Sequence, residues 1–187
     1  MKKTLSLIIL VFCLQSCTLQ SEYSKNDALV QSFECLKIKQ ELGEVSNLRN
    51  PYLMKLGEVL RKDSIPNKSL TDKITMMSTK IDQTITSSKK RIVALKSKHK
   101  DTRFFDATLE YLELNEKLEA KNTLLFSSFI NPNRDRDKEM LLGQEVGTLT
   151  QQVMNEQAAY KKKESEFHND YAIVQREVDS IISVIRN

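Results

Sequence analysis

Apolar residues recur every three or four positions along most of this chain, and this spacing constrains its fold more than any other feature. The clearest run comprises Leu70, Ile74, Met77, Ile81, Ile85, Ile92 and Leu95. Residues spaced in this way fall on one face of an α-helix. The 187 residues include only four glycines and three prolines, and no segment has the apolar–polar alternation of a strand. The sequence therefore predicts an all-α protein.

Turn-forming residues divide this pattern into four helices, and Ser69 followed by Asp72 resembles a capping box for the second. Proline removes a backbone donor, so Asn50-Pro51 predicts a break or kink in the first helix. Short loops between consecutive helices are typical of an antiparallel four-helix bundle, which is the predicted fold. The helices are expected at residues 27–62, 69–96, 102–129 and 136–186.

The last of these helices is predicted to be unusually long. At 1.5 Å per residue it would measure roughly 75 Å, against about 45 Å for the second and third helices. It is therefore expected to bend, to break, or to pair partly with the first helix. Gly143 and Gly147 are the candidate bends, although a Gly-x-x-x-Gly pair also marks close helix packing.

The first 16 residues have the composition of a secretory signal peptide. Lys2 and Lys3 precede an apolar run at residues 5–14, and the small residue Ser16 follows that run. A helix that spans a bilayer needs roughly 20 apolar residues, so this run is too short to remain as a membrane span. Residues 1–16 are therefore predicted to be a cleaved leader.

Leu14-Gln15-Ser16-Cys17 resembles the lipobox of bacterial lipoproteins. Cys13 does not fit that motif, because bulky Phe12 precedes it. The resemblance implies that Cys17 becomes the acylated first residue of the mature protein, the residue that palmitate would label. Several acyl chains together give stable anchoring to a membrane. The alternative is an ordinary cleaved leader with Cys17 as a free thiol.

This resemblance also divides the chain and suggests its destination. Residues 17–26 would be the lipidated cysteine and its tether, and residues 27–187 would be the helical domain. Thr18 stands where aspartate would favour retention at the inner membrane, so the outer membrane is expected. The implied partner is the membrane itself, through the lipid anchor.

A second resemblance is to the uncharacterised helical surface lipoproteins of Leptospira and Bacteroidota. It rests on DTRFFDATLEYLELNEKLEAK (residues 101–121) and YKKKESEFHNDYA (residues 160–172). No catalytic residues are known for these proteins, so the resemblance implies none in this chain. Asp63-Ser64-Ile65 also resembles the O-glycosylation sequon of Bacteroidota, which implies possible glycosylation at Ser64 in an exposed loop. Asp179-Ser180-Ile181 matches as well, but within the last helix, where access is expected to be poor.

The sequence contains no recognisable catalytic or metal-binding motif. His99 lies in a turn and is expected to be solvated, and His168 follows Glu164 by one turn. A di-iron bundle needs Glu-x-x-His on two helices, and position 165 is serine. Zinc-binding spacings, phosphate-binding glycine loops and hydrolase triads are also missing. The sequence therefore predicts a protein that is not an enzyme and holds no metal or cofactor.

The charge of the chain argues against nucleic acid as a partner. The formal net charge is +4, and it falls to about +2 when Lys2 and Lys3 leave with the leader. The basic stretches are not interleaved with aromatic residues that could stack on bases.

An antiparallel arrangement would place the turn at residues 97–102 beside the membrane and the turns at 63–68 and 130–135 far from it. The turn at 97–102 and the residues beside it are basic. They predict a membrane-facing basic patch of Lys96, Lys98, Lys100 and Arg103. The alternative is a solvated basic turn that suits the C-terminal end of a helix dipole.

Cys35 is the second cysteine that the mature chain would retain. It precedes Leu36 on the first helix, so it is expected at the edge of the core, buried and inert. The alternative is a disulfide to a partner or to a second copy of the chain. An internal disulfide is excluded if Cys17 is lipidated.

Together these features favour a membrane-anchored envelope lipoprotein with a non-catalytic helical domain that acts by binding or structural support. The second hypothesis is a helical periplasmic adaptor or chaperone that engages a partner protein, akin to coiled-coil adaptors. Exposed apolar residues on the half of the last helix that lies far from the membrane would favour it. A cofactor-carrying bundle is the third hypothesis.

Overall fold

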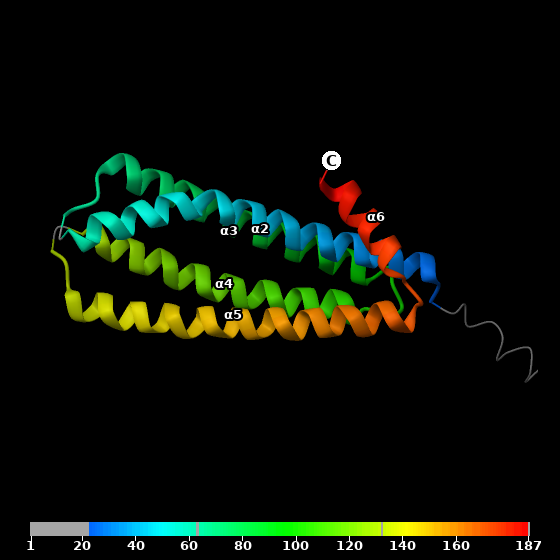
Figure 1. Ribbon diagram of the computed structural model, residues 1–187. Helices are drawn as coiled ribbons and strands as arrows, with labels where there is room; N and C mark the ends of the chain where they lie inside the picture. The colour runs from blue at the N-terminus through cyan, green and yellow to red at the C-terminus, as the bar shows by residue number, and fades with distance from the viewer. Residues whose placement is uncertain (1–22, 63, 132, 187) are drawn as a thin grey trace, which may run out of the picture.

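The computed structural model describes residues 23–62, 64–131 and 133–186. Within these ranges the chain forms five helices and no strand, which confirms the all-α class (Figure 1). None of the described helices is both long and apolar enough to cross a bilayer. The helices are α2 (Lys25–Arg61), α3 (Lys68–Lys96), α4 (Arg103–Phe129), α5 (Arg136–Asp170) and α6 (Gln175–Arg186).

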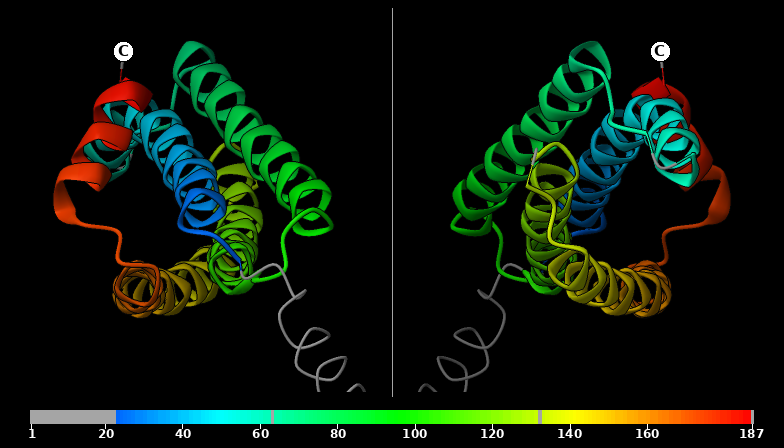
Figure 2. Two further views of the ribbon diagram at one scale, coloured as in Figure 1. Left: turned by 90° about the vertical axis from the view of Figure 1, so that its right-hand side faces the viewer. Right: turned by 90° about the vertical axis from the view of Figure 1, so that its left-hand side faces the viewer.

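The first four of these helices run back and forth along the long axis of a helical bundle, and α6 turns back to pack on α2 (Figures 1 and 2). α4 contacts α2, α3 and α5. One end of the bundle, called the base below, contains the start of α2, the turn at 97–102 and the segment 171–174. The opposite end, called the tip, contains the connecting residues 64–67, 130–131 and 133–135.

The starts of α2 and α3 differ slightly from the sequence expectation. The Oγ atom of Ser24 accepts a hydrogen bond from the Asp27 amide, and the Ser24 amide donates to the Asp27 carboxylate, both at 3.1 Å. This reciprocal capping box begins α2 at Lys25. The capping box expected at Ser69 is wrong, because Asn67 caps α3 by accepting from the Leu70 amide at 2.9 Å.

Of the break or kink predicted at Asn50-Pro51, the break is wrong, because α2 continues through both residues as one 37-residue helix. A proline inside a helix removes one backbone hydrogen bond. Pro51 is exposed, whereas Arg49 and Leu56 on either side of it are buried against the bundle. Tertiary contacts therefore hold both halves of α2 in place.

The long helix expected at 136–186 breaks, and its last part pairs with the first helix, which are two of the expected outcomes: α5 ends at Asp170, and α6 starts at Gln175 and packs on α2. One continuous helix over these residues is therefore wrong. Gly143 and Gly147 lie inside α5 and mark no interruption. At the break the Ala172 amide donates to the Asn169 carbonyl at 3.1 Å, and the Ile173 amide donates to the His168 carbonyl at 2.8 Å. These two bonds are those of a Schellman motif, which ends a helix.

The core consists of two apolar clusters. The larger cluster lies toward the base and includes Ile38, Ile85, Phe104, Tyr160 and Phe167. The smaller cluster lies toward the tip and is built from Leu56, Leu70 and Ile74, with partly buried aromatic residues packed against it. Buried polar side chains separate the two clusters, and the pocket described below adjoins the smaller one.

Candidate functional site

Cys17, the predicted lipidation site, lies outside the described residues. The described fold begins at Tyr23, so five residues, 18–22, separate it from Cys17. Tyr23 packs against the larger core cluster, and therefore the fold begins within the segment 17–26 that was expected to be a tether.

Tyr23 is held at the base by a network of hydrogen bonds. Its hydroxyl lies 2.6 Å from Nδ1 of His99 and accepts a hydrogen bond from Nε2 of Gln31 at 2.7 Å. Gln31 also donates to the Asp101 carbonyl at 2.8 Å, and the Tyr171 hydroxyl donates to the Asp101 carboxylate at 2.6 Å. The expectation of a solvated His99 is wrong, because its half-buried ring also packs edge-on against Phe105. The network joins three segments of the base.

The predicted basic patch also lies at the base, but nearby acids neutralise part of it. Lys96 pairs with Asp106, and Arg103 pairs with both Asp101 and Asp170. Arg103 also lies over the rings of Phe167 and Tyr171. The side chains of Lys98 and Lys100 are exposed. A membrane-facing role for these residues stays a prediction.

The predicted glycosylation site, Ser64, lies at the tip. Ser64 is exposed, and its hydroxyl donates to the Lys62 carbonyl at 3.3 Å. Ser180, the second sequon match, is exposed as well but lies within α6. Modification at Ser64 stays a prediction.

Cys35 is buried, as predicted, with none of its surface exposed. It lies in the larger core cluster, where its thiol donates to the Phe104 carbonyl at 3.6 Å. Burial raises the pKa of the thiol far above its usual range. Because the thiolate is the reactive form of cysteine, this site is inert in the folded protein.

His168 and Ser32 form a buried pair between α5 and α2. Nε2 of His168 lies 2.9 Å from Oγ of Ser32. Ser32 is completely buried and His168 is 8% exposed, and burial lowers the pKa of the imidazole. The ring therefore stays neutral near pH 7. The described residues include no group of three or more His, Cys, Asp or Glu side chains that could hold a metal ion.

Arg49 and Glu119 form a buried ion pair that the sequence reading missed. Arg49 is 7% exposed and Glu119 is 3% exposed. Nη1 of Arg49 also donates to the Ser78 hydroxyl at 3.0 Å. A signal was present in the sequence, because each charged residue interrupts a seven-residue core repeat. The two repeats are Cys35, Leu42, Arg49 and Leu56 on α2, and Phe105, Leu112, Glu119 and Phe126 on α4.

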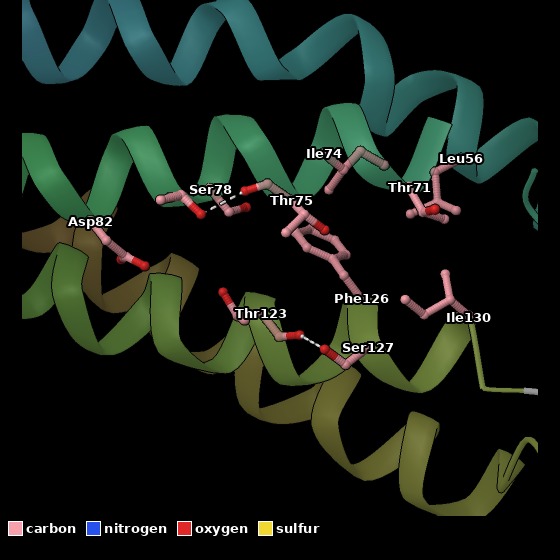
Figure 3. A pocket seen from close by; sticks show the side chains of 11 residues that line it. Leu56, Thr71, Ile74, Thr75, Ser78, Asp82, Thr123, Phe126, Ser127 and Ile130 are labelled. Carbon is pink, nitrogen blue, oxygen red and sulfur yellow. Dashed lines mark hydrogen bonds between the residues drawn. The ribbon is translucent and has the colours of Figure 1, made fainter. Parts of the chain in front are cut away.

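Next to this pair a pocket of about 100 Å³ opens between α3 and α4. Its apolar part is formed by Leu56, Ile74, Phe126 and Ile130. Figure 3 shows Asp82 at one end and Ile130 near the other. Hydroxyl side chains from both helices line the rest of the wall: Thr71, Thr75, Ser78, Thr79, Thr123 and Ser127.

Asp82 brings a negative charge to this pocket. Its carboxylate makes no hydrogen bond or ion pair with any residue that the structure describes. Asp82 is exposed, but partial desolvation and the nearby Glu119 carboxylate raise its pKa, and Arg49 acts in the opposite direction. Because Arg49 is already paired with Glu119, the group of three carries one net negative charge.

Exposed apolar side chains occur along the whole bundle, for example Val30, Val93 and Val184, and some of them lie toward the tip. Met54 is 71% exposed and Ile65 is 73% exposed. In the first part of α5, Met140 is 59% exposed and Leu141 is 58% exposed. Lone exposed apolar residues are ordinary on protein surfaces, whereas groups of them mark interaction sites.

The chain was compared with protein-family models, with curated proteins and with solved structures. None of the three comparisons found a match.

Proposed function

We propose that this protein is an envelope lipoprotein, anchored in the outer membrane through Cys17, whose non-catalytic helical domain acts by binding. The observation that supports this proposal is the position of Tyr23. The described residues start at Tyr23, six positions after Cys17, and six extended steps span at most about 20 Å. An anchor at Cys17 would therefore hold the base of the bundle against the lipid surface and direct the tip away from it.

The exposed residues at the tip favour a second candidate, a helical adaptor that engages a partner protein. Met140 and Leu141 lie on the part of α5 farthest from the base, and Met154 farther along the same helix is 59% exposed. Methionine is flexible and polarisable, which suits surfaces that accept apolar partners. In both candidates the domain binds rather than catalyses.

The anchor is tested by palmitate labelling in cells. Cys17→Ser should abolish the label and leave unprocessed precursor, because the acceptor thiol is gone. Cys13→Ser, four residues away, is the matched control and should retain the label. Label that persists in Cys17→Ser would rule out the anchor.

The adaptor candidate is tested by photo-crosslinking in intact cells. A crosslinking residue at Met140 should give one discrete adduct. The same residue at Lys162, which is exposed in the base half of α5, should not. Equal adducts at both positions, or no adduct at Met140, would rule out a binding surface on the first part of α5.

A further inference from the structure

We propose that the surface of α2 on which α6 packs is also an interface between two copies of this chain. In the resulting swapped dimer the segment 171–174 becomes helical, and α6 of each copy packs on α2 of the other. This interface goes beyond the proposed function and does not depend on an anchor at Cys17.

The way in which α6 is attached to the bundle makes this exchange possible. Among the described helices, α6 packs chiefly on α2. Val178, on the apolar face of α6, is buried in the larger core cluster, and Ile182 packs against that cluster. A second copy presents the same surface on its own α2. The same contacts can therefore form within one chain or between two.

The segment that joins α5 to α6 favours the exchange, because it is short and strained. Tyr171-Ala172-Ile173-Val174 contains no glycine or proline. Ala172 has a φ of 50°, a left-handed conformation that costs free energy for residues other than glycine. In a helix that continues from 136 to 186 this cost disappears. Short connections under strain promote the exchange of an element between copies.

Two contacts of the same segment oppose the exchange. The Lys25 ammonium donates to the Ala172 carbonyl at 2.8 Å, and the side chain of Ile173 is buried in the core. Both contacts depend on the turn at 171–174 and are lost when that segment becomes helical. The monomer is therefore favoured at low protein concentration, and the swapped dimer at high concentration.

The direction of α6 fits two bundles that meet base to base. α5 runs from the tip to the base, and α6 turns back from the base along α2 (Figure 1). With 171–174 helical, α6 continues past the base in the direction of α5. A second copy related by a twofold axis receives this helix at its own base, so α6 runs along that α2 in the same sense as within one chain. If both copies were anchored, they would lie along the lipid surface.

Lys25 and Glu177 report which copy α6 occupies. Nζ of Lys25 lies 2.8 Å from Oε2 of Glu177, and a carbodiimide couples an ammonium and a carboxylate in contact as an amide. In the monomer this link stays within one chain, whereas in the swapped dimer it joins two chains. Lys89 and Glu116 form the matched control pair, because they are also 2.8 Å apart but lie on α3 and α4, which do not exchange.

The test uses the full-length chain in a neutral detergent, with equal parts of heavy-nitrogen-labelled and unlabelled protein. After incubation at a series of concentrations, carbodiimide coupling and mass spectrometry identify the linked peptides. Mixed Lys25–Glu177 pairs, with one labelled and one unlabelled peptide, should increase with protein concentration, whereas Lys89–Glu116 pairs should never be mixed. The absence of mixed Lys25–Glu177 pairs at every concentration, or mixed pairs at both sites, would overturn the proposal.

Variants at Gln175 separate the exchange from other kinds of association. Gln175 is exposed and is the first residue of α6, a position that tolerates proline. Inside a continuous helix, proline removes a hydrogen bond and clashes with the preceding turn, so Gln175→Pro should reduce mixed Lys25–Glu177 pairs at least about tenfold and keep the unmixed pairs. Gln175→Ala is the matched control and should keep both. Mixed pairs that persist in Gln175→Pro, or that vanish in Gln175→Ala as well, would contradict the swapped dimer.

Discussion

The side chains of Arg49 and Glu119 meet inside the bundle between its two apolar clusters. Removing two charges from water costs several kcal/mol per ion, and their attraction offsets this cost only when hydrogen bonding is complete. It is incomplete here, because Nε of Arg49 is buried without a partner among the described residues. We therefore expect the pair to add little net stability, and we infer that it helps to fix the register of α2 against α4.

If the Arg49–Glu119 pair adds little net stability, replacing one partner should destabilise the protein much more than replacing both. Arg49→Met should lower the free energy of unfolding by about 3–5 kcal/mol, because it leaves Glu119 charged, buried and unpaired. Arg49→Met combined with Glu119→Leu should lie within about 1 kcal/mol of the parent, or above it. Urea unfolding of a fragment that starts at residue 23, followed by circular dichroism, measures both. A double variant less stable than Arg49→Met would show that the pair contributes substantial net stability.

At the scale of elements, the segment between α5 and α6 decides the shape of the C-terminal part. Ala172 has a φ of 50°, a left-handed conformation that glycine adopts without strain. The bonds to Lys25 hold this segment on α2: its ammonium donates to the Ala172 carbonyl and pairs with Glu177, both at 2.8 Å. The buried side chains of Ile173 and Val178 add apolar contact with the core. These contacts stabilise a break that the local sequence does not favour.

Glycine at position 172 should therefore stabilise the protein. The left-handed conformation costs a non-glycine residue about 1–2 kcal/mol, and part of this is offset by the larger unfolded-state entropy of glycine. Ala172→Gly should raise the free energy of unfolding by about 0.5–1 kcal/mol.

The matched control is Ala158→Gly on an exposed turn of α5. Ala158→Gly should lower the free energy of unfolding by about 1 kcal/mol, because the backbone there is helical. Urea unfolding compares the two variants, and a destabilising Ala172→Gly would contradict the Schellman interpretation.

At the scale of the whole molecule, the bundle has two chemically different ends. The base carries the Tyr23 network and ion pairs that involve Arg103. The tip carries the exposed Met54 and Ile65, with the pocket nearby. α3 joins the two ends with 29 residues, a length of about 43 Å. If Cys17 is anchored, the base lies at the lipid surface and the tip points away from it.

Fluorescent labels at the two ends of α3 test this orientation. Ser97→Cys lies at the base and Ser64→Cys at the tip, and both serines are exposed. Buried Cys35 should not react with the label. In liposomes that contain the acylated protein, a quencher attached to lipid headgroups should quench the label at position 97 strongly and the label at position 64 weakly. Equal quenching would mean that the bundle lies flat on the membrane.

The sequence by itself determined those features that depend on residues close together in the chain. The apolar period gave the helical class, and the turns near 63–68, 97–102 and 130–135 separate helices in the structure. Burial of Cys35 also followed from its place beside the apolar stripe of α2. Each of these features depends on residues a few positions apart, so a single helix face is enough to encode it.

Only the tertiary structure decided the features that depend on distant parts of the chain. α2 continues through Pro51 because buried residues on both sides hold it, and α5 ends before Tyr171 because Lys25 and the core secure the next segment. The pairs Ser32–His168 and Arg49–Glu119 join residues 136 and 70 positions apart. The pocket needs hydroxyl residues on two helices to face each other. No periodicity along one helix specifies which face of another helix it will meet.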